Sequence, residues 1–223
     1  MLPTEVIALL LTLAVFSAIS YKKRLLNIEG ILIANSIGIA IFLFSEWNLT
    51  FFFVAVLFFV VAEAGTLYSK KGKRKHEVRT TGNILGNSGT AVLALALGFQ
   101  FGFFAALAAA LADTLSGEIG LLSKKKPVLI TTLKEVEPGT DGGVTRLGLI
   151  AGVFGAAVIA SVHFAINQDL FLFGVLVVSG FVGSVADSFF GAVLERQKKL
   201  DNAEVNFLGS LSGTVMAWIL TSI

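Results

Sequence analysis

Three acidic residues interrupt strongly apolar segments, and their side chains are the ones in this sequence best suited to chemistry. Asp113 and Glu118 end an alanine-rich segment, and Asp187 ends a segment rich in valine and glycine. Placing one carboxylate at the centre of a membrane helix costs roughly 2.5–3.5 kcal/mol, so acids in such segments are functional candidates. Carboxylates that face one another repel, and Mg²⁺ relieves this because it binds one or two carboxylates together with substrate phosphates. The sequence therefore predicts catalytic and Mg²⁺-binding roles for Asp113, Glu118 and Asp187.

A glycine-rich segment follows the first two acids and could bind phosphate. Residues 137–145 contain three glycines, whose backbone freedom lets amide groups converge on an anion. The segment leads into an apolar helix near Thr145, and helix N-termini attract phosphate. Arg79 and the asparagines after it lead into another helix in the same way. The predicted phosphate-binding residues are Arg79, Asn83, Asn87, Thr114, Lys124, Gly139, Thr140, Gly142, Gly143, Thr145 and Asn206.

Several other chemistries lack the residues that they need. The chain has no cysteine and only two histidines, His76 and His163, so thiolate chemistry is excluded and a histidine metal cluster is not expected. The sequence contains no GxxxxGK[ST] segment and no serine, histidine and aspartate set. The net charge of +2 gives no indication of a nucleic-acid partner. What remains suits phosphoryl transfer, in which positioning and charge neutralisation do most of the catalytic work.

The composition places these residues in a membrane protein. Hydrophobic residues make up 55% of the 223 residues and charged residues 14%, which is too little polar surface for a soluble domain. We therefore predict an all-α polytopic membrane protein of about eight transmembrane helices, forming a single integral membrane domain over residues 1–223. The apolar segments, judged against the roughly 20 residues that a bilayer core requires, are 3–20, 29–45, 50–68, 84–100, 103–122, 146–166, 170–194 and 206–223.

The basic residues predict how these helices are oriented. All 17 lysines and arginines lie in alternate connections, whereas the connections at 45–48, 99–102 and 166–169 carry none. The positive-inside rule then places the basic loops in the cytoplasm and both termini outside. The N-terminal segment lacks a basic start and a small-residue cleavage site, so we expect it to be retained as a helix. The one long polar loop, residues 123–146, is predicted to be cytoplasmic and has a β-like stretch at 128–132.

Short motifs recur along the chain and indicate repeated helix hairpins around a shared polar centre. An alanine and an acid occur together at 62–63, 112–113 and 186–187, each time late in an odd-numbered helix. At 100° per residue, Asp113 and Glu118 fall in one polar sector of their helix. Even-numbered helices instead carry small and polar residues on one face, which lets helix backbones approach closely. These residues are Asn83, Gly86, Asn87 and Thr90, and then Asn206, Gly209, Ser210 and Gly213.

Four sequence motifs are long enough to be specific for a family. They are Ala-Asp-Thr-Leu-Ser-Gly-Glu-Ile-Gly at 112–120, Leu-Ile-Thr-Thr at 129–132, Pro-Gly-Thr-Asp-Gly-Gly-Val-Thr at 138–145, and Ser-Gly-Phe at 179–181 with Ala-Asp-Ser at 186–188. In these motifs the chain resembles the integral membrane family that includes the plant phytyl-phosphate kinase of the vitamin E pathway and related uncharacterised transmembrane proteins.

The resemblance implies a kinase acting on an isoprenoid lipid. Its substrate would be a prenyl monophosphate of the phytyl or geranylgeranyl type, converted to the diphosphate by a nucleoside triphosphate, with CTP the expected donor. An oligomer is compatible with the resemblance. Residues 70–82 depart from the family's usual pattern, being more basic and lacking the acidic residue and glycine before the arginine. The residues that match the family's recurrent positions are Arg79, Asn87, Asp113, Thr114, Glu118, Pro138 to Thr145, Asp187 and Asn206.

The acidic and glycine-rich residues and the family resemblance together indicate one reaction. The prenyl phosphate would lie near Asn83 and Asn87, with Mg²⁺ on the three acids bridging the donor phosphates. Arg79, Lys124 and the amides of 139–143 would stabilise the phosphate oxygens. Two alternatives stay open. An ion-coupled membrane transporter also uses acids within repeated helices, and a CTP-dependent lipid cytidylyltransferase would share the metal and the donor but release pyrophosphate.

Overall fold

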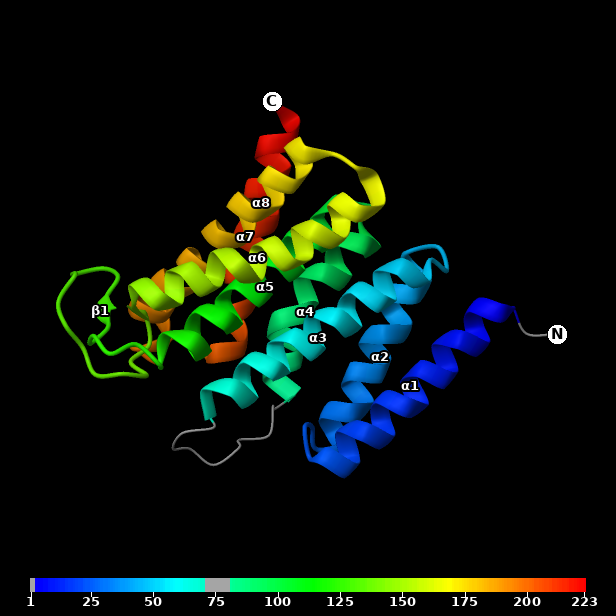
Figure 1. Ribbon diagram of the computed structural model, residues 1–223, viewed down its shortest axis with the longest axis horizontal. Coiled ribbons are helices and arrows are strands. Elements are labelled where there is room, and N and C mark those ends of the chain that lie inside the picture. The colour runs from blue at the N-terminus through cyan, green and yellow to red at the C-terminus, as the bar shows by residue number, and fades with distance from the viewer. Residues whose placement is uncertain (1–2, 71–80) are drawn as a thin grey trace.

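Most of the chain is helical in the computed structural model, which describes residues 3–70 and 81–223 (Figure 1). Eight α-helices occur in the described residues, so the predicted all-α fold is confirmed. Arg79 lies outside the described residues. The helices are α1 (Thr4–Lys23), α2 (Ile28–Phe44), α3 (Leu49–Lys70), α4 (Thr81–Ala96), α5 (Gln100–Gly120), α6 (Arg146–Asn167), α7 (Leu170–Phe190), which continues as the π-helical turn η1 (Gly191–Glu195), and α8 (Asn202–Ser222).

Some helices begin or end at other residues than predicted, because local capping interactions determine where each helix starts and stops. α4 ends at Ala96 because Gly98 takes a positive φ of 74° that breaks the helix. α8 begins well before the predicted residue 206 because of a capping box. The Asp201 side chain accepts from the Glu204 amide at 2.9 Å, and the Glu204 side chain accepts from the Asp201 amide at 2.8 Å.

The helices fall into two classes by length. Six of them (α1, α3, α5, α6, α7 and α8) are long and apolar enough to cross a membrane. α2 has 17 residues and α4 has 16, so at 1.5 Å per residue they reach roughly 24–26 Å, short of a bilayer core of about 30 Å. The chain is therefore a multi-pass integral membrane protein in which two of the eight helices are shorter than the spanning length.

Helix α5 forms the centre of the bundle. Every residue from Gly102 to Ala112 is buried, and the helix packs against α3, α4, α6, α7 and α8. Most of these buried residues are alanines, which occupy little space and let neighbouring helices surround α5 on all sides. The hairpin partners α5 and α6, and α7 and α8, pack directly against each other, whereas α3 packs mainly on α5, and α4 packs on both α8 and α5.

Glycines bring α5, α7 and α8 into close contact. A Cβ added at Gly183 of α7 would lie 2.5 Å from the Ala109 Cβ of α5 and 2.9 Å from the Gly209 carbonyl oxygen of α8. A Cβ added at Gly213 would lie 2.8 Å from the same Ala109 Cβ. There is no room for larger side chains here, so the three backbones are fixed relative to one another.

The N-terminal helices pack in a different way. α1 lies at one edge of the bundle beside α2 (Figure 1) and packs chiefly against it. A separate apolar cluster joins α1, α2 and α3 through Leu9, Leu13, Phe42 and Phe52. Few residues of α1 are buried, namely Leu9, Leu13 and Ser20. This edge of the molecule therefore has large side chains where the centre has alanine and glycine.

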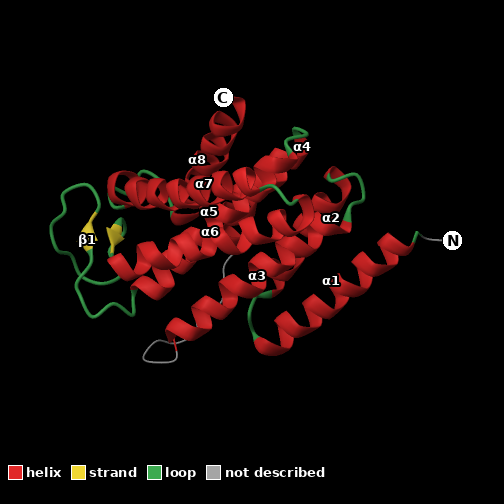
Figure 2. Ribbon diagram, turned by 45° about the horizontal axis from the view of Figure 1, so that its top comes forward, coloured by secondary structure: helices red, strands yellow, loops and turns green. Residues whose placement is uncertain are grey.

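A small β-hairpin closes the loop between α5 and α6. Strand β1 (Val128–Leu129) pairs antiparallel with β2 (Gly143–Val144), with Val128 opposite Val144. The predicted β-like stretch is thus a strand over its first two residues. Figure 2 shows both strands beyond the end of the helical bundle, so the loop lies against one end of it.

Candidate active site

A polar cavity of about 670 Å³ opens at one end of the bundle. Its walls come from the C-terminal parts of α3, α5 and α7, the N-terminal parts of α4, α6 and α8, and the loop between α5 and α6. These helix ends all lie on the same side, because each odd-numbered helix runs toward that side and each even-numbered helix leaves it. The cavity therefore lies where one face of a membrane would be.

The cavity brings most of the predicted site residues together. The exceptions are Lys124, which does not line it, and Arg79, which lies outside the described residues. Glu63, the acid that repeats the pattern on α3, is buried but is not part of the lining either. The predicted residues that line the cavity are Asn83, Asn87, Asp113, Thr114, Glu118, Gly139, Thr140, Gly142, Gly143, Thr145, Asp187 and Asn206.

Asp113 and Asp187 form a pair at the inner end of the cavity. Their carboxyl groups lie close enough to interact directly, so their like charges repel unless a proton or a cation neutralises one of them. Each aspartate lies one helical turn from the close contact between Ala109 and Gly183. The glycine packing of α5 against α7 therefore also sets how far apart the backbones that carry the two aspartates lie.

Gly209 of α8 makes the space that Asp187 occupies. A Cβ added at Gly209 would lie 2.8 Å from the Asp187 Cβ and 2.9 Å from its Oδ2. That Oδ2 atom is buried and has no hydrogen-bond partner in the part of the chain that the structure describes. A buried carboxylate oxygen without a partner is costly unless a ligand such as a metal ion contacts it.

The donor set fits Mg²⁺ in part. Two carboxylates with one unsatisfied buried oxygen suit a hard cation that takes its other ligands from phosphates and water. Among the described residues, no three histidine, cysteine, aspartate or glutamate side chains gather closely enough to bind one ion. Glu118 lines the cavity but accepts a hydrogen bond from Ser69. The predicted metal role therefore fits the aspartate pair better than all three acids together.

Further acids make the cavity strongly negative. Besides Asp113, Glu118 and Asp187, the lining includes Asp141 of the loop and Glu195 of η1. Lys125 is the one lysine or arginine in the described lining. Against the described lining, the negative charge of a nucleotide or lipid phosphate would have to be offset by accompanying cations.

Lys125 replaces Lys124 as the lysine of the cavity because of a turn after α5. The Ser123 hydroxyl donates to the Lys125 carbonyl at 3.0 Å and accepts from the Lys125 amide at 3.2 Å. This turn leaves Lys124 exposed outside the lining. Three consecutive lysines cannot be told apart in the sequence, because only the turn determines which of them faces the site.

The glycine-rich loop packs against the end of α7. Gly142 has a φ of 73°, and a Cβ there would lie 2.6 Å from the Ala192 backbone nitrogen, so only glycine fits. The amides of Thr140 and Gly143 donate to the carbonyls of Glu137 and Thr140 at 3.1 and 2.9 Å. These two amides are thus already paired. Of residues 139–143, those whose amides donate to no backbone carbonyl of the described chain are Gly139, Asp141 and Gly142.

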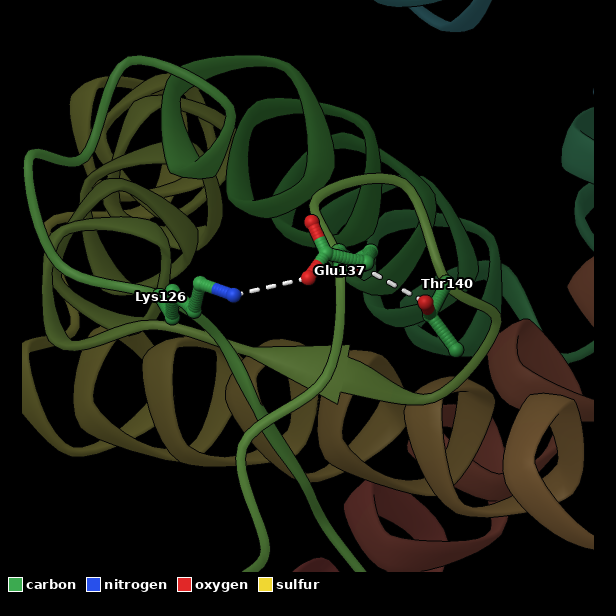
Figure 3. A network of polar contacts seen from close by, with 3 residues as sticks. All are labelled: Lys126, Glu137 and Thr140. Carbon is green, nitrogen blue, oxygen red and sulfur yellow. Dashed lines mark hydrogen bonds and ion pairs between the residues drawn. The ribbon is translucent and has the colours of Figure 1, made fainter.

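A second contact holds the outer part of this loop. Figure 3 shows Lys126 donating to Glu137 Oε1 at 2.7 Å, and the Thr140 hydroxyl donating to the Glu137 carbonyl, also at 2.7 Å. The hydrogen bond and the charge of Glu137 raise the pKa of Lys126. Glu137 thus joins the start of the hairpin to the glycine-rich turn through its side chain and its backbone.

Asparagines line the side of the cavity near α4 and α8. The Asn83 amide donates to Asn202 Oδ1 at 3.1 Å, and the Asn206 amide donates to the same oxygen at 3.4 Å. Asn202 was not among the predicted site residues, because the helix was predicted to start later, at residue 206. The capping box at Asp201 and Glu204 was the signal that could have found it.

These features define an all-α, multi-pass integral membrane protein with an acid-lined cavity at one membrane face. The chain belongs to the DUF92 family of integral membrane proteins, whose model matches residues 11–214. This confirms the membrane family that the motifs indicated. No solved structure matches the chain.

Relatives extend from archaea to plants. The chain is 34% identical to the uncharacterized membrane protein MJ0933 of Methanocaldococcus jannaschii, over 95% of this chain and 92% of the relative. It is 27% identical to Protein PGR of Arabidopsis thaliana, over 79% and 74% of the two chains. It is 29% identical to Protein VTE6, chloroplastic, of the same plant, over 55% of this chain and 38% of VTE6.

Proposed function

We propose that this protein is a Mg²⁺-dependent prenyl-phosphate kinase. It transfers the γ-phosphoryl group of a nucleoside triphosphate, with CTP the expected donor, to a prenyl monophosphate of the phytyl or geranylgeranyl type. The observation that carries the proposal is the pair of Asp113 and Asp187, placed at the inner end of a polar cavity that ends at a membrane face. The motif resemblance to phytyl-phosphate kinase and the partial match to VTE6 support the class of substrate.

The chemistry needs no general base. An oxygen of the prenyl phosphate attacks the γ-phosphorus, the bond to the β,γ-bridging oxygen breaks, and the nucleoside diphosphate leaves with that electron pair. Because the attacking oxygen is already anionic, the protein has only to align the groups and neutralise charge. Mg²⁺ held by Asp113 and Asp187 would supply much of that neutralisation.

Each wall of the cavity has a role in this reaction. Asp113 and Asp187 would hold the metal ion, with Glu118 as a more distant acid. Lys125 and the unpaired amides of the glycine-rich loop would contact phosphate oxygens. Asn83 and Asn87 would orient the prenyl phosphate. Thr114, Thr145 and Asn206 line the same cavity and would complete its polar surface.

The proposed orientation places the cavity in the cytoplasm, where nucleotides are available. The lysines and arginines lie in the connections on the side of the cavity, and the positive-inside rule assigns that side to the cytoplasm. Both termini would then be outside. Reporter fusions at the two ends of the chain test this orientation.

One assay separates the kinase from its alternatives. Purified protein in nanodiscs is incubated with Mg²⁺, CTP labelled at the γ-phosphate, and phytyl monophosphate, and the lipid and aqueous products are separated. We expect label in the lipid, and its loss with EDTA. Released pyrophosphate with a cytidine-containing lipid would show a cytidylyltransferase instead. If neither product forms with any nucleoside triphosphate, the kinase proposal is wrong and ion-driven transport is measured next.

A further inference from the structure

A second, apolar chamber lies beside the polar cavity. It provides about 80 Å³ of free space between α1, α2, α3 and α4, with Leu107 of α5 at its back. Its walls are almost entirely aliphatic and aromatic. The lining residues of the first three helices are Leu13, Phe16, Ala34, Ile37, Gly38, Ile41, Phe52, Ala55, Val56, Phe58 and Phe59.

The apolar chamber and the polar cavity share two residues. Asn83 and Asn87 line both, because they lie on the face of α4 between the two spaces. Next to them, Ile84 and Ser88 line the apolar chamber only. A molecule with a polar head and an apolar chain can therefore occupy both spaces at once, with the junction at the two asparagines.

We infer that the apolar chamber binds the isoprenoid chain of the lipid substrate and limits its length. The inference rests on the proposed function, because it assigns the chain of the same molecule whose phosphate lies in the polar cavity. The occupant is an isoprenoid chain covalently joined to a phosphate, since such a molecule uses both the apolar walls and the asparagine junction.

The ends of the chamber can be located along α2. Gly30 lies near α4, since a Cβ there would be 3.2 Å from the Ile84 Cδ1, so this end of α2 adjoins the polar cavity. Gly38 lies at the far end, where a Cβ would be 3.0 Å from Phe52 and 3.2 Å from Leu13. Phe52 and Leu13 are buried and close that end.

The middle of the chamber is narrowed by two rings. Phe16 of α1 and Phe59 of α3 meet edge to face with centroids 5.0 Å apart. α1 packs chiefly against α2 and buries few residues. It is therefore the helix that can move aside when an isoprenoid chain enters. An entering chain would then replace the ring contact with contacts of its own.

Two alanines allow the chamber to be shortened from either end. Ala34 of α2 lies one turn from Gly30, near the junction, and Ala55 of α3 lies near Phe52, at the far end. Ala55→Phe should raise KM for geranylgeranyl monophosphate by more than about tenfold and leave geranyl monophosphate unchanged. Ala34→Phe should raise KM for both lipids. Val60→Phe is the matched control on α3, because Val60 is 55% exposed and does not line the chamber.

A labelling experiment tests the site without relying on turnover. Geranylgeranyl monophosphate with a diazirine at the end of its chain is photolysed with the wild-type protein in nanodiscs, and the labelled peptides are identified. We expect label on the chamber walls of α1, α2 and α3, and less of it in Ala55→Phe but not in Val60→Phe. Bulk phospholipid carrying a diazirine in its acyl chain should label the outer helix faces instead.

The two experiments separate this inference from the proposed function. Label in the chamber with no kinase turnover would support the lipid site and reject the kinase. Turnover whose dependence on chain length is the same in Ala55→Phe and Val60→Phe would reject the chamber as the site of the chain. Equal labelling of the chamber by bulk phospholipid would also reject it, because the chamber would then be a general lipid contact.

Discussion

The two spaces that meet at Asn83 and Asn87 are built from opposite kinds of side chain. The polar cavity lies where α5, α7 and α8 meet through alanine and glycine, and a methyl group added at Gly183 or Gly213 would overlap its neighbours. The apolar chamber lies among helices rich in phenylalanine, where rings such as those of Phe16 and Phe59 touch edge to face. The cavity measures about 670 Å³ and the chamber about 80 Å³.

This difference in packing explains how one helix bundle can combine a rigid polar site with an adaptable apolar one. Backbone contact between helices leaves no side chains to rearrange, so the backbones that carry Asp113 and Asp187 keep a fixed separation, which the proposed metal site would need. Large side chains can rotate, so the same bundle can admit an apolar chain into a space that is narrow when empty. We therefore expect substitutions near the cavity to alter catalysis and those near the chamber to alter the choice of lipid.

The largest effect should follow from removing one charge of the aspartate pair. Asp113→Asn and Asp187→Asn keep the size of the side chain but remove a ligand charge, and we expect kcat/KM to fall roughly 1,000-fold or more. The turnover assay with labelled CTP measures this fall in kcat/KM. The fall should be the same for every lipid chain length, because the change leaves the apolar chamber intact.

Asp169→Asn is the matched control for this change. Asp169 caps α7 at the end away from the cavity, where its Oδ1 accepts from the Leu172 amide at 2.9 Å, and asparagine caps equally well. Full activity in Asp169→Asn with none in Asp187→Asn would locate the effect at the pair. Normal activity in Asp113→Asn or Asp187→Asn would mean that the aspartates do not bind the metal ion. The proposed difference between a catalytic cavity and a lipid-selecting chamber would then be wrong.

The next largest effect should come from a single methyl group that moves an aspartate. In Gly209→Ala the new Cβ would lie 2.9 Å from Asp187 Oδ2, so the carboxyl group must shift. We expect kcat to fall roughly 10- to 100-fold while the protein still folds, since small misplacements of catalytic groups have effects of this size. Size-exclusion chromatography and circular dichroism check the fold, and the turnover assay gives kcat.

Gly174→Ala is the corresponding control on α7. A Cβ at Gly174 meets no atom within 4 Å, so this variant should keep full activity and gain slightly in stability, because alanine favours helix. Equal losses in Gly174→Ala and Gly209→Ala would mean that glycine packing does not set the position of Asp187.

A smaller effect is expected at Glu118. This acid lines the same cavity but accepts a hydrogen bond from Ser69 rather than joining the aspartate pair. Glu118→Gln keeps that hydrogen bond, and we expect roughly a tenfold loss of kcat/KM or less. The Mg²⁺ concentration that gives half-maximal turnover is measured as well, because it tests whether Glu118 binds the metal ion. A loss as large as that of Asp113→Asn would mean that Glu118 is also a metal ligand.

Much of the fold and of the cavity could be predicted from the sequence for simple reasons. The apolar segments and the alternate placement of basic residues indicate eight helices without any contact information. The acids and the glycine-rich segment all lie near helix ends on the same side, so it was expected that Asp113, Asp187 and Gly142 would approach one cavity. Their chemical roles stay predictions.

Other features depend on contacts that the sequence does not display. Which of the three lysines enters the cavity depends on the turn at Ser123, and the alanine and acid motif on α3 places Glu63 outside the lining although it matches the other two. The apolar chamber is formed by side chains from five helices, so no single segment indicates it. Its connection to the cavity through Asn83 and Asn87 is visible only in three dimensions.

The smallest effect should be at the ion pair of Lys126 and Glu137, which helps to hold the loop of the polar cavity. Both side chains are exposed, by 54% and 77%, so solvent and salt weaken the pair. Since Glu137 raises the pKa of Lys126, the stabilisation is fully present below the unfolded pKa of about 10.4 and is lost as the pH rises through the folded value. Cleavage of residues 123–145 by an alkaline protease should then speed up less than about twofold across that pH range, and Glu137→Gln should abolish the change. The packing of Gly142 against Ala192 is independent of pH, so it should keep the loop in place throughout. A complete release of the loop above that pH would mean that charge, rather than close backbone packing, holds this wall of the cavity.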